Sequence, residues 1–299
     1  MVETSLALIA TRWSWEPTVL LGLELALAVY LAGVFPLRRR YGWASRVERR
    51  RVVAFVAGLL TIFVALVSPL DFVADRYLFS AHMVQHLLLI LVMPPLILLG
   101  LPGWLIRPLL RGPRVARVAR WITHPVVTFS LFNANFWLWH LPKLYQLAMA
   151  SLAVHSLMHV LFMGTALLNW WPVLSPLPEL RLRSYPARMA YLFAQTWPDT
   201  GLSVLLAFSP TLLYPAYALA PRLWGIEPLT DQQLGGILMW IPGSLVYLGA
   251  VSVLFFRWFE QQEPGEGTDE VVHDGVAHPR TRAIFSATEE AGEREGALV

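Results

Sequence analysis

The chain has 299 residues, no cysteine and a formal net charge of +3, and 56% of its residues are hydrophobic. The lack of cysteine excludes disulfides and thiolate metal sites, so a soft metal ion would need histidine and methionine ligands. The hydrophobic share exceeds that of ordinary soluble domains, and the arginines cluster between apolar runs. This pattern predicts a membrane protein and no nucleic-acid partner.

Seven apolar segments are long enough to cross the roughly 30 Å hydrocarbon core of a bilayer as helices. They are Thr18–Leu37, Val52–Leu70, Ser80–Leu101, Trp121–Leu141, Ser151–Trp171, Ala187–Phe208 and Leu234–Phe256. Pro198 and Asp199 interrupt the sixth. The sequence therefore predicts an all-α, polytopic membrane protein whose seven-helix transmembrane bundle occupies residues 1–259.

The arginines predict how this bundle is oriented. The loops after the first, third and fifth segments carry Arg38, Arg39, Arg40, Arg46, Arg49, Arg50, Arg51, Arg107, Arg111, Arg114, Arg117, Arg120, Arg181 and Arg183. The opposite side carries only Arg12, Arg76, Lys143 and Arg222. Because arginine-rich loops stay cytoplasmic, the N-terminus is predicted outside and the C-terminus inside, in the inner or plasma membrane. Residues 260–299 are predicted to form an acidic, disordered cytoplasmic tail.

Five histidines lie in or at the ends of the third, fourth and fifth segments: His82, His86, His140, His155 and His159. With the predicted orientation, all five fall at one depth near the outer face. Residues four apart share a helix face, so each of the two H-x-x-x-H pairs is spaced for metal ligation. An unpartnered imidazole is costly in lipid, so a functional cluster is expected, although single membrane histidines also form ordinary interhelical hydrogen bonds.

Imidazole with thioether and without thiolate favours copper, particularly Cu(I). Met83 faces a direction similar to that of His86, and Met163 and Met239 are further candidates at nearby levels. Apolar packing is the commoner role of methionine. A b-type haem is the alternative cofactor, since histidines on two facing helices can supply both axial ligands.

Four acidic residues deserve individual predictions. Asp71 lies just before the histidine pair of the third segment, where it can attract a cation or orient a histidine N–H. Asp75, in the same stretch, is expected to be a loop acid or a helix cap. Asp199 is expected to face the bundle interior as an additional candidate. Asp231 is expected to cap the seventh segment.

Several uncommon motifs follow one another in order. They are Ser68-Pro69-Leu70-Asp71, His82-Met83-Val84-Gln85-His86, Pro94-Pro95, Trp139-His140-Leu141-Pro142, His155-x-x-x-His159, Trp170-Trp171-Pro172 and Asp231-Gln232-Gln233. In order and spacing they resemble the CtaG-type cytochrome c oxidase assembly factor family over most of the chain. The resemblance implies a seven-span protein that takes part in maturation of bacterial haem-copper oxidases. It also implies copper-site candidates at His82, Met83, His86, His140, His155 and His159.

The expected function is therefore non-enzymatic: a metallochaperone that binds copper near the outer face and hands it to an oxidase subunit. An extracytoplasmic copper chaperone is a further expected partner. No nucleophile–base pair or nucleotide-binding loop occurs in the sequence. Two alternatives remain open, a haem-binding membrane protein and a copper transporter. A transporter would need polar residues across the whole bilayer, whereas the candidates here lie on one side.

Overall fold

The computed structural model describes residues 9–262, and this part of the chain is helical without β-strands. The helices are α2 (Pro17–Ala32), α3 (Arg38–Tyr41), α4 (Arg49–Leu66), α5 (Pro69–Arg76), α6 (Phe79–Leu87), α7 (Met93–Gly100), α8 (Gly103–Ile106), α9 (Pro113–Ile122), α10 (Pro125–Trp139), α11 (Pro142–Ala150), α12 (Leu152–Leu174), α13 (Tyr185–Ala207) and α14 (Pro228–Glu260). The predicted all-helical class is confirmed. The acidic tail, apart from its first residues, lies outside the described part of the chain.

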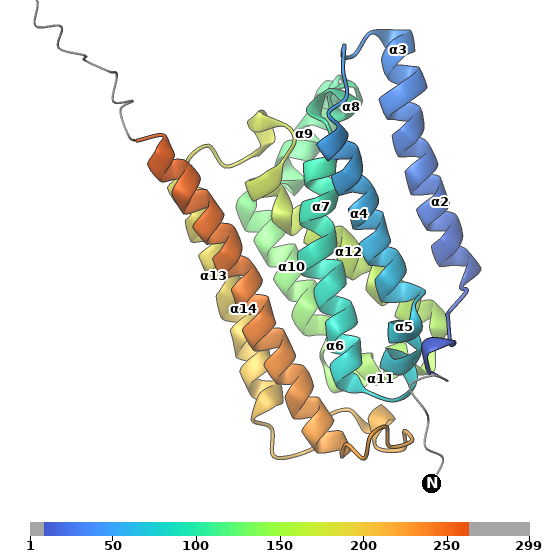
Figure 1. Ribbon diagram of the computed structural model, residues 1–299. Helices are drawn as coiled ribbons and strands as arrows, with labels where there is room; N and C mark the ends of the chain where they lie inside the picture. The colour runs from blue at the N-terminus through green and yellow to red at the C-terminus, as the bar shows by residue number, and fades with distance from the viewer. Residues whose placement is uncertain (1–8, 263–299) are drawn as a thin grey trace, which may run out of the picture. The chain divides into compact units, whose positions relative to one another are not determined.

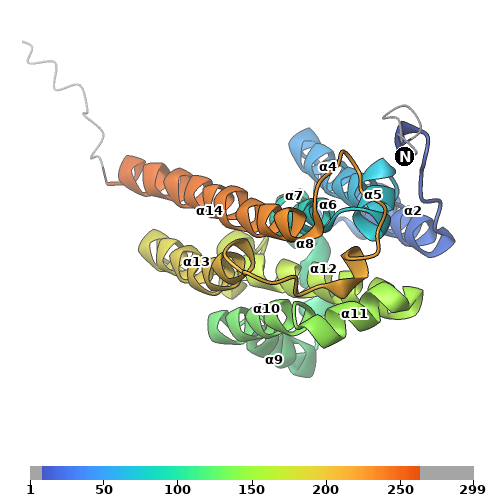
Figure 2. The same cartoon turned by 90° about the horizontal axis from the view of Figure 1, so that it is seen from below.

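The long helices run side by side (Figures 1 and 2). Helix α2 lies along one flank next to α4, and α13 and α14 form the opposite flank. The short helices α5 and α11 lie at one end of the bundle, and α3 and α8 lie at the other (Figure 1). We call these the α5 end and the α3 end.

Four stretches of the described chain are long and apolar enough to cross a membrane: Pro17–Tyr41, Phe79–Gly100, Leu152–Leu174 and Pro228–Glu260. A fifth results if α4 and α5, bent by 42° relative to each other, form one broken span. The other two predicted segments correspond to α10 and α13, which fall outside this set. The structure thus supports four to five candidate spans, and the number seven stays a prediction.

Glycines bring neighbouring helices into close contact. A Cβ atom added to Gly236 of α14 would lie 2.5 Å from the backbone nitrogen of Ala207 on α13. One added to Gly100 of α7 would lie 2.5 Å from the backbone nitrogen of Phe55 on α4. The Tyr30 hydroxyl of α2 donates a hydrogen bond of 3.0 Å to the Gly100 carbonyl. Small residues therefore set the spacing at two helix interfaces, as is common in membrane bundles.

Helices α6 and α7 form one continuous rod through a wide, π-helical turn at Leu88–Val92. Pro94 has no N–H, so the carbonyl of Ile90, four residues earlier, loses its usual α-helical donor. The indole N–H of Trp170 on α12 donates to this carbonyl at 3.1 Å. The proline pair is therefore accommodated inside the helix because another helix satisfies the freed backbone group.

Trp170→Phe is expected to lower stability by about 1–3 kcal/mol, because it keeps an aromatic ring but leaves the buried Ile90 carbonyl without a donor. Thermal unfolding of the detergent-purified protein measures the change. Trp121→Phe is the matched control, since the Trp121 side chain is 66% exposed. Equal melting temperatures for the two variants would contradict the role of this hydrogen bond.

Candidate metal centre

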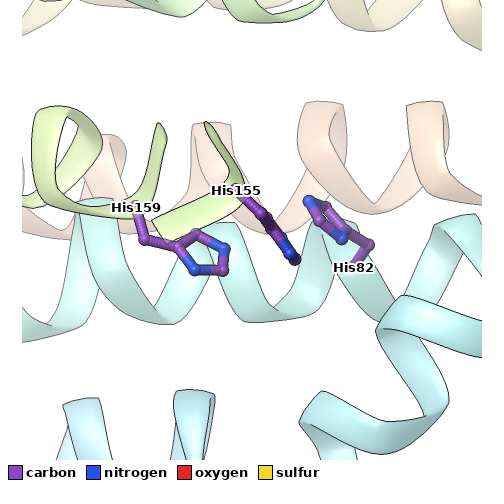
Figure 3. Close-up of side chains that lie close together, drawn as sticks. All are labelled: His82, His155 and His159. Atoms are coloured by element: carbon purple, nitrogen blue, oxygen red, sulfur yellow. The ribbon is translucent and has the colours of Figure 1, made fainter. Parts of the chain in front are cut away.

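Three histidines converge near the α5 end: His82 of α6, and His155 and His159 of α12 (Figure 3). Each offers one ring nitrogen, and these three atoms lie within 4.8 Å of one another. All three residues are buried, and Figure 3 shows the His155 ring between the other two. We call this group the histidine triad.

The triad nitrogens are largely without hydrogen-bond partners. Both ring nitrogens of His82 are buried and unpaired, as are Nε2 of His155 and Nε2 of His159. A buried polar atom without a partner costs free energy, so such a concentration is expected only where a ligand satisfies the atoms. Neutral imidazole nitrogens are good ligands for copper, zinc and iron. The triad is therefore chemically fit to hold a metal ion.

Helical periodicity places the two α12 histidines together, as the sequence predicts. Their ring centroids are 4.4 Å apart, and the His155 ring stacks 5.4 Å from the His82 ring. The position of His82 depends on the start of α6. Asp231 of α14 fixes that start, because its carboxylate accepts from the backbone N–H of Phe79 at 2.6 Å and of Ser80 at 3.2 Å.

The Asp231 carboxylate also accepts from the Ser80 hydroxyl. The sequence predicts that Asp231 caps its own helix, α14. The structure corrects this prediction, because the helix that Asp231 caps is α6. The carboxylate reaches across to α6, where the first backbone N–H groups have no partners within the helix. Sequence position alone shows that an acid lies at a helix start, but not which neighbouring helix start it faces.

The structure brings Asp75 to the triad. Its Oδ1 lies 4.0 Å from Nδ1 of His82, and its Oδ2 lies 3.7 Å from Nδ1 of His155. The expectation of an ordinary loop acid or cap is corrected by this placement. Asp71 lies one helical turn earlier and accepts a hydrogen bond of 2.7 Å from the Gln85 side chain. Their four-residue spacing was the available signal, since it places both carboxylates on one helix face.

His86 and His140 lie beside the triad but outside it. Their ring centroids are 6.0 Å apart, and the His86 ring lies 5.6 Å from that of His159. The Phe136 carbonyl can only accept, so Nδ1 of His140, 2.7 Å away, donates to it and Nε2 carries the lone pair. That Nε2 and both nitrogens of His86 are buried and unpaired. All five predicted histidines therefore form one cluster, of which three can share an ion.

The three methionine candidates make different packing contacts. A Cβ atom added to Gly235 of α14 would lie 3.2 Å from Cγ of Met83, so Met83 packs toward α14. Met239 belongs to the same hydrophobic core. Met163 packs against smaller clusters formed with α2 and α4. Asp199 faces α14, where its Oδ2 would lie 3.1 Å from a Cβ atom added to Gly243.

Tyrosines from the segment between α13 and α14 close the α5 end of the cluster. The Tyr217 hydroxyl donates to the Ala74 carbonyl, and the Tyr214 hydroxyl donates to the His140 carbonyl, both at 2.9 Å. The Tyr145 hydroxyl lies 2.9 Å from that of Tyr217. Burial raises the pKa of Tyr214 and of Tyr217, so both phenols stay protonated and act as donors. The hydropathy of the sequence does not predict that these tyrosines lie at this end of the histidine cluster.

Comparison with known proteins finds relatives that are similar to this chain in sequence. An uncharacterized protein of Mycobacterium bovis (Mb0105) is 26% identical over 275 residues, which cover 86% of this chain and 41% of the relative. An uncharacterized protein of Mycobacterium leprae (ML1998) is 23% identical over 248 residues, or 78% of this chain and 37% of the relative. The chain thus spans about two fifths of these relatives.

No solved structure matches the chain significantly. A family model does match, over residues 28–261, and these residues include the triad, Asp75, His86 and His140. The model describes the cytochrome c oxidase caa3 assembly factor. The match covers most of the chain and agrees with the resemblance carried by the motifs. The chain therefore belongs to the cytochrome c oxidase caa3 assembly factor family.

Proposed function

We propose that this protein binds copper as Cu(I) at the triad of His82, His155 and His159 and hands it to a subunit of the oxidase. The observation that carries the proposal is that each of the three buried histidines offers one ring nitrogen within 4.8 Å of the others, and that four of their six ring nitrogens have no hydrogen-bond partner. Imidazole nitrogen is a good ligand for copper. The chain contains no cysteine, so a thiolate site for a soft metal ion is excluded. Membership of the family supports the oxidase as the recipient of the copper, because the family is that of a cytochrome c oxidase assembly factor.

Three neutral ligands suit a cargo that has to leave again. A site with few ligands leaves room for a ligand of the partner to bind before a histidine lets go, so transfer proceeds by exchange. Asp75 places a carboxyl group near His82 and His155, which favours orientation of the imidazole N–H groups and can ionise when a cation approaches. These roles need no chemical conversion of a substrate, and we assign the protein no catalytic activity.

The proposed membrane arrangement has seven crossings, with α10 and α13 as the two beyond the apolar set. Both run alongside α12 and α14 in the bundle (Figure 1). The arginines of α3 and α9 lie toward the α3 end, away from α5 and α11 (Figure 1). By the positive-inside rule the α3 end is cytoplasmic and the N-terminus is outside. Copper would then be exchanged on the outer side of the inner or plasma membrane, with an extracytoplasmic chaperone as its donor.

The geometry favours a single ion over haem. Three imidazoles approach one point, whereas a bis-histidine haem needs two facing ligands with a macrocycle between them. Absorption spectra of the purified protein separate these cases, because haem gives a Soret band and Cu(I) does not. A Soret band at one haem per chain would replace copper with haem in the proposal.

A complementation experiment tests the function. In cells that lack their own copy, the wild-type protein is expected to restore oxidase activity and oxidase copper content. The triple variant His82→Ala/His155→Ala/His159→Ala is expected to restore neither, because it lacks the copper ligands. His124→Ala is the control, since His124 is an exposed histidine at the start of α10. Full restoration by a stably expressed triple variant would refute the proposal.

A further inference from the structure

A chamber of about 630 Å³ lies between α2, α4, α5 and α12 and leads to the triad. His155, His159 and Asp75 line it. The Asp75 side chain is 30% exposed, whereas those of His82 and His155 are 0% and 9% exposed. The chamber therefore leads to the buried ligands past a partly exposed carboxylate that lies within 4.0 Å of a ring nitrogen of each of these two histidines.

The walls of the chamber change from polar to apolar along its length. On the α2 side, Ser14 and Glu16 precede Val19, Gly22 and other apolar lining residues. The wall from α4 is lined by leucine and isoleucine, and the acids of α5 follow it toward the α5 end.

The lining from helix α12 also becomes apolar with depth. After Leu152 at the start of the helix it continues with His155, Ser156 and His159, and it ends with Val160 and Met163. A helix rises 1.5 Å per residue, so the wall becomes apolar within about 10 Å beyond Ser156. Among the lining residues of the described chain, no charged group lies deeper than the histidines. The polar path ends at the triad.

The polar part of the chamber is acidic. The carboxyl groups of Glu16, Asp71 and Asp75 line it, against one guanidinium group, that of Arg76. Arg76 lies over the Phe72 ring, 5.2 Å from its centroid, which draws this charge against the aromatic face. A cleft with excess negative charge and apolar walls concentrates cations.

We propose that this chamber is the access route of the metal cation, open at the α5 end and closed toward the α3 end. The cation is then loaded and released on the same side of the membrane, as handover requires and transport does not. The identity of the cation as copper rests on the proposed function, while the existence and sidedness of the route do not.

Single cysteines test the route directly, because the natural chain has none. Gly22→Cys and Ile62→Cys place a thiol in the chamber lining. Gly249→Cys on α14 is the control, because added Cβ atoms at Gly22 and at Gly249 both meet nothing within 4 Å and Gly249 is not part of the lining. The probes are a cationic and an anionic methanethiosulfonate of similar size, added to right-side-out or inside-out vesicles.

Both chamber cysteines are expected to react with the cationic probe at least about tenfold faster than with the anionic one, as charge steering predicts. They are expected to react only from the side of the α5 end, and the Gly249→Cys control is expected not to react. Equal rates for the two probes, reaction from both sides, or no reaction at either chamber position would overturn the proposal. These readouts contain no copper, so they stand apart from the proposed function.

A variant that narrows the chamber tests whether the metal ion passes through it on the way to the triad. Gly22→Leu is expected to slow Cu(I) loading about tenfold or more at unchanged final copper content, because it narrows the route without removing a ligand. Gly249→Leu is expected to load at the wild-type rate, and gel filtration checks that both variants fold. Equal loading rates in the two variants would overturn the access route. If the wild-type protein binds no copper while the chamber cysteines still show the expected labelling, the proposed function fails and the route remains.

Discussion

Replacing His82, His155 and His159 by alanine is expected to reduce bound Cu(I) from about one ion per chain to background. Each single replacement is expected to weaken binding about 100-fold, since a ligand contributes on the order of 3 kcal/mol to a histidine site. The reason is geometric: these are the three nitrogens within 4.8 Å of one another in the described chain. Elemental analysis after dialysis and competition with a Cu(I) chelator give occupancy and affinity.

Two comparisons make this result specific. His124→Ala is expected to keep wild-type copper, because His124 is exposed and lies at the opposite end of α10 from His140 and the histidine cluster. His86→Ala and His140→Ala are expected to retain the bound ion with smaller losses of affinity, since both rings border the triad. Full copper in the triple variant, together with complete loss in His86→Ala, would move the site to the other half of the cluster.

Asp231→Ala is expected to destabilise the protein by about 3 kcal/mol, because it removes a buried carboxylate that accepts charge-assisted hydrogen bonds. The backbone N–H groups of Phe79 and Ser80 would lose their acceptor at the start of α6. The variant is also expected to bind copper more weakly, because His82 lies in the first turn of that helix. Thermal unfolding with and without Cu(I) measures both effects.

Asp231→Asn distinguishes capping from simple packing, since the amide keeps the shape and one accepting oxygen. It is expected to lose roughly half of the stability that Asp231→Ala loses. Glu227→Ala is a matched control, because Glu227 is an exposed acid just before the same helix. If Asp231→Ala melts at the wild-type temperature, the carboxylate does not hold the start of α6.

The fold was predictable to the extent that it depends on long apolar runs. Each of the seven predicted segments is helical over most of its length, the third as α6 and α7 joined by the π-helical turn, because only a helix satisfies its backbone within one apolar segment. The shorter helices α5, α9 and α11 were not predicted. They have 8 to 10 residues and carry charged side chains, so hydropathy does not distinguish them from loops.

The sequence predicts at which membrane depth the histidines lie, but not which of their side chains meet. Spacing and predicted orientation bring the histidines to one level, because depth depends only on the rise of each helix. Which rings meet depends on how the helices are rotated about their axes. Met83 shows this, since its packing toward Gly235 of α14 does not follow from the spacing that makes it a candidate ligand. The position of Asp75 beside the triad depends on the bend after Leu66, which directs α5 across the end of the histidine cluster.

The wide turn at Leu88–Val92 affects the direction in which His82 projects. A π-helical turn holds one residue more than an α-helical turn, so it rotates α6, which carries His82, relative to α7. Helix α7 is pressed against Phe55 of α4 at Gly100. Without the extra residue, the side chains of α6 would be turned by about 100° around the helix axis relative to those of α7. The wide turn between the two helices therefore contributes to the placement of His82 against α12.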